Sequence, residues 1–179
     1  MKKLLILLSI ISTSFVNAQE FPISEKTGKV SYEGVVKIDS LSAQEIYSRA
    51  NEWFAITFNS AQSVIQMNDA EAKKIIGKGS TNVMFRTFDG GQFFYTISFF
   101  AKEGRYKYII TDIYHKSSPA NPNGSGGDIA NETPSCKKWY LTIKQWSDFR
   151  TQAETNINLL IDNLNQYMNK TNTLDDDDW

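Results

Sequence analysis

The chain has one cysteine and one histidine among its 179 residues. Because a single cysteine cannot form a disulfide within the chain, stability has to come from packing. We expect Cys136 to be a small residue in a loop or at a helix start, with an intermolecular bridge or a reactive thiol as the alternative. The single histidine, His115, excludes the two-histidine helical zinc signature and leaves at most one imidazole for a catalytic triad. We predict that His115 is a surface residue at the end of a strand.

Sequence motifs for cofactors and nucleophilic catalysis are also missing. There is no Gly-x-Ser-x-Gly nucleophile elbow. The segment 77–81 lacks the serine or threonine directly after Gly-Lys that a phosphate-binding loop requires. The glycines of 124–127 lie in a polar loop and not between a strand and a helix, where a dinucleotide fingerprint would place them. The sequence therefore predicts no cofactor, no metal and no catalytic residue.

The chain has no excess of basic charge. Its 19 lysines and arginines face 20 aspartates and glutamates, which gives a formal charge of −1. A nucleic-acid-binding surface gains affinity from counterion release, and this requires basic side chains. We therefore expect no nucleic-acid partner, although this composition is compatible with a local basic patch.

The N-terminus has the pattern of a secretory signal peptide. Two lysines follow Met1, residues 4–11 are apolar, and residues 16–18 offer a small-residue cleavage site. The apolar stretch is too short for a membrane span. We expect residues 1–18 to be removed and the protein to be exported to the periplasm or the exterior, with no transmembrane segment.

After the signal peptide, the sequence predicts a single domain. Residues 19–29 contain a proline and a glycine and indicate an irregular lead-in. Residues 171–179 form an acidic tail that we expect to be disordered. Residues 30–170, between them, are enough to bury a substantial core.

The first two elements of this domain have clear patterns. Apolar and polar residues alternate over 30–38, which predicts a half-buried strand. Ser42 and Glu45 have the spacing of a capping box, which predicts a helix over about 43–57.

The middle of the chain is rich in strand patterns. We expect strands at 63–66, 72–79, 82–88, 92–101 and 105–115. The run Asp89-Gly90-Gly91 is the strongest hairpin signal among the turns that join them. Consecutive strands joined by tight turns predict an antiparallel sheet.

The last third of the chain changes character twice. Residues 116–136 are polar and rich in Ser, Pro, Asn and Gly, which predicts a long exposed loop. From Trp139 to Met168 apolar residues recur at spacings of three and four, which predicts an amphipathic helix of roughly 25–30 residues.

The order β-α-β(4–5)-α favours an α+β fold, in which a curved antiparallel sheet carries both helices on one face. The second face then stays uncovered unless a partner, a ligand or the long loop fills it.

Three segments carry a family resemblance: residues 45–54, which contain Ala-x-x-Trp-Phe, residues 64–66, and residues 75–79, which read Ile-Ile-Gly-Lys-Gly. Together they resemble a secreted bacterial family of unknown function whose fold is described as like that of the TATA-box-binding protein (TBP). Residues 95–98 and 108–115 fit its later strands. The resemblance implies a β-α-β(n)-α fold and supplies no catalytic residue. A likeness of fold does not import DNA binding.

Aromatic side chains provide the one candidate site. The strand expected at 92–101 has apolar residues on both faces. If the helices cover the face of Phe93, then Phe94 and Phe100 line the open face. With Arg86 on a neighbouring strand, they are predicted to form a shallow apolar site with a polar anchor.

We therefore predict a non-catalytic binding module that uses the open face of the sheet. Its partner is an unknown protein, a small apolar ligand or a second copy of the chain. The first alternative is an enzyme, with Asp112, His115, Arg86 and Tyr114 as candidates if a pocket brings them together. The second is an envelope assembly or oligomerisation protein that uses the long helix or an exposed strand edge.

Overall fold

The computed structural model describes residues 21–58 and 60–170. The expected signal peptide and acidic tail lie outside the described residues. Of the expected lead-in, residues 21–29 are described, and Ile23 of this segment forms an isolated bridge with Val30. Within the described part of the chain, no helix is both long and apolar enough to span a membrane.

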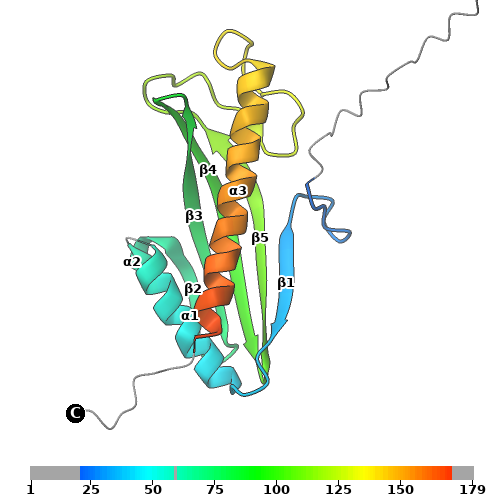
Figure 1. The fold of residues 1–179 in the computed structure, drawn as a ribbon, viewed down its shortest axis with the longest axis vertical. Coiled ribbons are helices and arrows are strands. Elements are labelled where there is room, and N and C mark those ends of the chain that lie inside the picture. Colours follow the sequence, from blue (N-terminus) through cyan, green and yellow to red (C-terminus); the bar gives the residue numbers. More distant parts are fainter. Residues whose placement is uncertain (1–20, 59, 171–179) are drawn as a thin grey trace, which may run out of the picture.

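An antiparallel sheet forms one layer of the molecule (Figure 1). Its strands are β1 (Tyr32–Lys37), β2 (Ile65–Asp69), β3 (Lys74–Phe85), β4 (Phe88–Lys102), β5 (Arg105–Lys116) and β6 (Gly127–Asp128). The spatial order is β1-β5-β4-β3-β2, and β6 pairs with the end of β5. The three long strands β3, β4 and β5 therefore form the centre of the sheet.

Two helices, α1 (Ala43–Thr57) and α3 (Ile143–Met168), form the second layer and lie on the same side of the sheet (Figure 1). Two glycines on that side leave room for their rings. A Cβ on Gly77 would lie 2.9 Å from Phe54 of α1, and one on Gly90 would lie 2.5 Å from Phe149 of α3. The predicted α+β fold with both helices on one face is confirmed.

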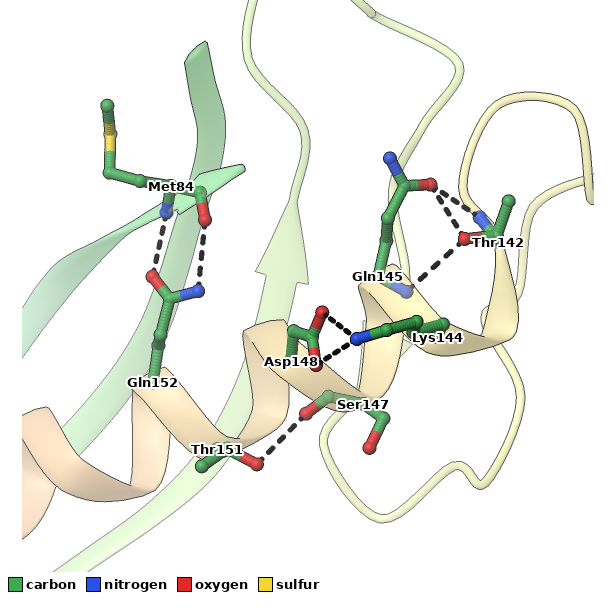
Figure 2. A network of polar contacts seen from close by, with 8 residues as sticks. All are labelled: Met84, Thr142, Lys144, Gln145, Ser147, Asp148, Thr151 and Gln152. Atoms are coloured by element: carbon green, nitrogen blue, oxygen red, sulfur yellow. Dashed lines mark hydrogen bonds and ion pairs between the residues drawn. The ribbon is translucent and has the colours of Figure 1, made fainter. Parts of the chain in front are cut away.

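Capping boxes start both helices. The Ser42 side chain accepts from the backbone N–H of Glu45, and the Glu45 carboxylate accepts from the backbone N–H of Ser42. Thr142 and Gln145 repeat this arrangement at the start of α3 (Figure 2). Each box satisfies two backbone donors that a helix N-terminus would otherwise leave unpaired.

The core lies between the two layers. Two fully buried indoles, Trp53 of α1 and Trp146 of α3, anchor it. The indole nitrogen of Trp53 donates to the Asn163 side chain at 2.8 Å, and that of Trp146 donates to the Asn131 carbonyl at 2.8 Å. A buried polar group is tolerated when it is hydrogen-bonded, and both of these are.

The turn between β3 and β4 differs from the prediction. Arg86 and Thr87 connect the strands, with Arg86 at a φ of 56°. The expected turn at residues 89–91 lies inside β4 instead. The register shifts there opposite Val83, and Gly90 is the extra residue of a β-bulge.

Two further expectations about the strands were wrong. The strands expected at 72–79 and 82–88 are one continuous strand, β3. The strand expected at 63–66 begins with the short helix α2 (Ala61–Val64), which leads into β2.

The segment expected as an exposed loop at 116–136 folds back onto the sheet. It contributes β6, and Ile129 directly after β6 is fully buried in the core. The helix that follows starts at Ile143, so Trp139 precedes it and is 74% exposed. The apolar spacing of Trp139 matched the helix by coincidence, because the capping box at Thr142 sets the start.

Helix α3 also covers part of a sheet edge. Strand β2 pairs only with the first residues of β3, so the rest of β3 has no strand on that side. Gln152 of α3 accepts from the Met84 backbone N–H at 2.9 Å and donates to the Met84 carbonyl at 3.0 Å (Figure 2). One turn later, Asn156 donates to the Asn82 carbonyl at 3.2 Å. Two amide side chains thus occupy backbone groups to which another strand would otherwise bind.

Candidate binding site

Strict alternation along β4 gives the sheet a second, partly exposed face. Phe93, Tyr95, Ile97 and Phe99 are buried beneath the helices, and the residues between them are half-buried on the opposite side. We call this opposite side the open face. Phe94 and Phe100 both lie on it, where the sequence places them.

The strand register assembles two cross-strand rows at one end of the open face. The first row is Lys74, Phe100, Lys107 and Val35, from β3, β4, β5 and β1. The second row is Lys102, Arg105 and Lys37, from β4, β5 and β1. Neighbours in such a row are about 5 Å apart, so the side chains of four strands meet in a small area.

A groove of about 440 Å³ lies over these rows. It is lined by Val35, Phe100, Lys102, Arg105, Tyr106, Lys107 and Ile109. Its apolar side chains come from three strands, and Val35 is 62% exposed. The volume falls within the usual range for small-molecule sites. We call this feature the open-face groove.

The two predicted phenylalanines belong to different clusters. Phe100 lines the groove, with the Lys74 amino group 5.3 Å from its ring centroid. Phe94 stacks on Tyr114 at 5.5 Å, with the Lys116 amino group 5.4 Å from the Phe94 ring. Six residues of strand separate them by about 20 Å. A single shallow site that contains both is therefore not formed.

Arg86 is also separate from these clusters. It lies in the β3–β4 turn and not on a strand, and its guanidinium is 5.5 Å from the Phe85 ring centroid. It lines a second cavity with residues from the start of α3, on the helix side. The predicted polar anchor is therefore not placed next to Phe94 or Phe100.

Sequence reasoning missed the basic residues of the groove. Lys102, Arg105 and Lys107 flank the turn between β4 and β5, so their charges follow directly from the strands that were expected there. The signal was a cluster of cations beside Phe100 on one side of a hairpin. The overall composition does not reveal this basic cluster, because the chain as a whole has no excess of basic charge.

One carboxylate lies beside the groove. The Lys107 amino group is 2.9 Å from a Glu33 carboxylate oxygen. This hydrogen bond, with a smaller contribution from Ser31, holds the pKa of Glu33 below its usual value. Within residues 21–58 and 60–170, neither Lys102 nor Arg105 has a carboxylate oxygen within 4.0 Å.

The expectation that His115 is a surface residue was wrong, because its side chain is 1% exposed. Its ring centroid lies 5.0 Å from that of Phe93, 5.8 Å from that of Trp146 and 5.5 Å from that of Phe149. Burial lowers the pKa of His115. The His115 side chain faces the core because of a β-bulge at Asp112, which has a φ of 54°. Beyond this bulge, the alternation of inward-facing and outward-facing residues in β5 is reversed.

The four candidates for an enzyme site are not brought together. Asp112 forms an exposed ion pair with Lys29 at 2.7 Å. His115 is in the core, Tyr114 is on the open face, and Arg86 is in the β3–β4 turn. Among the described residues, no group of three His, Cys, Asp or Glu side chains is placed to hold a metal ion.

Cys136 lies in the loop before α3 and is partly buried. Burial raises the pKa of its thiol, which opposes formation of the reactive thiolate.

Comparison with known proteins bears on the fold. A family described as a domain of unknown function (DUF4468) with a TBP-like fold matches residues 32–116. A crystal structure of a DUF4468 family protein from Bacteroides ovatus is similar, with a TM-score of 0.64 and 14% identity over 84% of this chain and 92% of that one. A TBP-like protein from Parabacteroides distasonis gives a TM-score of 0.58 and 18% identity over 80% of this chain and 96% of that one. At these identities the likeness shows the fold alone. No curated protein matches the sequence.

Proposed function

We propose that the protein, whose residues 32–116 match the model of the DUF4468 domain with its TBP-like fold, is a non-catalytic binding module that holds a small apolar ligand in the open-face groove. The supporting observation is the groove itself. It presents Val35, Phe100 and Ile109 toward solvent on a face that the helices leave free.

The energetic argument concerns the surface that a ligand would cover. Burying apolar area stabilises a complex by roughly 25 cal/mol per Å². Val35 is an exposed branched side chain, and Phe100 is only half-buried. A ligand in the groove removes both from water without any rearrangement of the sheet.

The test is a titration of isotope-labelled protein with decanol, followed by NMR. Decanol is uncharged, so its binding reports on the apolar contact without any ion pair. Chemical-shift changes are expected at Val35, Phe100 and Ile109. Replacing Phe100 removes an apolar contact, so Phe100→Ser is expected to weaken binding severalfold.

Phe94→Ser is the matched control, because Phe94 is on the same strand and the same face but outside the groove. The two variants lose the same side chain. Equal weakening by both variants, or shifts spread evenly over the surface, would contradict a site at the groove.

Export is part of the proposal and is supported by the pattern of residues 1–18. Expression of the full chain in a bacterial host, followed by osmotic shock, should release protein whose intact mass corresponds to a start at Gln19. Recovery of the full-length mass from the cytoplasm alone would overturn export.

A further inference from the structure

The rim of the open-face groove is basic although the chain has a formal charge of −1. Five cationic side chains occupy the two cross-strand rows: Lys37, Lys74, Lys102, Arg105 and Lys107. Four strands contribute them, so they are close in space while they are distributed along the sequence.

Three carboxylates that lie near these cations in the register or in the sequence are already engaged in contacts. Glu33 is bound to Lys107. Asp69, opposite Lys74 in the register, accepts from the backbone N–H groups of residues 71 and 72. Glu103 sits between Lys102 and Arg105 in sequence, but its carboxylate accepts from the backbone N–H of Ala43 at the start of α1. Among the described residues, Lys102 and Arg105 therefore carry positive charge without an ion pair beside the apolar side chains of the groove.

We infer that the groove selects amphiphiles that carry an acidic group, such as a carboxylate, a phosphate ester or a sulfate ester, on an apolar chain or ring. The acidic group lies on Lys102 and Arg105, which have no ion pair among the described residues, and the apolar part lies on Val35, Phe100 and Ile109. This inference rests on the proposed function and names its ligand class. The planar guanidinium of Arg105 offers paired donors to two oxygens of such a group.

The experiment compares four probes by calorimetry and NMR, with the two charged amphiphiles below their critical micelle concentrations and decanol below its solubility limit. Decyl phosphate carries both features, decanol lacks the charge, inorganic phosphate lacks the chain, and decyltrimethylammonium reverses the charge. Decyl phosphate is expected to bind about tenfold more tightly than decanol, because its charged oxygens accept strong hydrogen bonds that the decanol hydroxyl cannot match. This preference is expected to shrink as salt is added.

Charge-neutralising variants locate the effect. Arg105→Gln combined with Lys102→Gln is expected to lower the affinity for decyl phosphate about tenfold and to leave the affinity for decanol within twofold. Lys78→Gln is the control, because Lys78 is exposed on β3 outside the groove. Circular dichroism checks that each variant is folded.

The outcomes separate the inference from the proposed function. If decanol shifts the groove residues and decyl phosphate binds no better, the charge preference is overturned and the apolar site stands. If inorganic phosphate binds as tightly as decyl phosphate, the site is one for free anions and the amphiphile is overturned. If none of the four probes changes the chemical shifts of the groove residues, both this inference and the proposed function are overturned.

Discussion

The Nδ1 atom of His115 accepts a hydrogen bond of 2.9 Å from the backbone N–H of Gly126. The Nε2 atom lies 2.9 Å from the Gly90 carbonyl, so the neutral Nε2–H tautomer satisfies both contacts. A strand, a bulge and the long loop are thus joined through one imidazole. Protonation of Nδ1 removes its acceptor lone pair and breaks the bond to the loop.

This arrangement predicts a loss of stability in mild acid. Burial lowers the pKa of His115 in the folded protein, while in the unfolded chain it is about 6.5. The unfolded chain therefore binds more protons below that pH, and stability falls as the pH drops from 6.5 toward the folded-state pKa. Urea midpoints between pH 7.5 and 5.5 should decrease.

His115→Gln should be less stable at pH 7.5 and should show a flatter pH dependence over this range. Because the chain has one histidine, its imidazole can also be titrated directly by NMR. Identical slopes for the two proteins would show that His115 does not carry the acid sensitivity.

The amide contacts between α3 and β3 predict an effect on self-association. Replacing Gln152 and Asn156 by alanine leaves the backbone groups of Met84 and the Asn82 carbonyl unpaired at a strand edge. Each lost bond should cost about 1 kcal/mol, and the freed edge should pair with a second molecule. Sedimentation velocity should detect more self-association in this double variant than in the parent protein.

Thr155→Ala is the control for this test, because its hydroxyl donates to the Thr151 carbonyl of its own helix and not to the edge of β3 in the described structure. A double variant at Gln152 and Asn156 that sediments like the control would mean that the edge is protected in another way.

Two buried tyrosines predict opposite responses to the loss of a hydroxyl. The Tyr106 hydroxyl donates to the Asn165 side chain at 2.7 Å. The Tyr32 hydroxyl is buried with no hydrogen-bond partner among the described residues, and burial raises its pKa. Tyr106→Phe should destabilise by about 1 kcal/mol, whereas Tyr32→Phe should be neutral or stabilising. Thermal unfolding of both variants decides this, and a larger loss for Tyr32→Phe would contradict it.

Local signals predicted the parts of the fold that depend on local chemistry. The capping box at Ser42 predicted the start of α1, and the alternation of β4 predicted the two faces of the sheet. The same kind of signal was available at Thr142 and Gln145, and using it would have placed the start of α3 correctly.

The failures come from β-bulges and from register. Gly90 was predicted to be a turn residue because glycine is common both in tight turns and in β-bulges. The bulge at Asp112 reverses the alternation of β5, which moved His115 from the surface to the core. The local β4–β5 turn pairs Phe100 with Lys107, but the positions of Lys74 and Val35 beside them depend on the register of β3 and β1, which no local pattern specifies.

The position of β1 has a consequence for the time course of folding. Glu33 and Lys107 lie side by side although they are 74 residues apart in the sequence. Closing so large a loop is entropically costly and slow, while the β3–β4 and β4–β5 hairpins close locally. Because synthesis starts at the N-terminus, β1 cannot pair with its neighbour until β5 has been synthesised. Strand β1 is therefore synthesised before the other strands of the domain but is among the last to join the sheet.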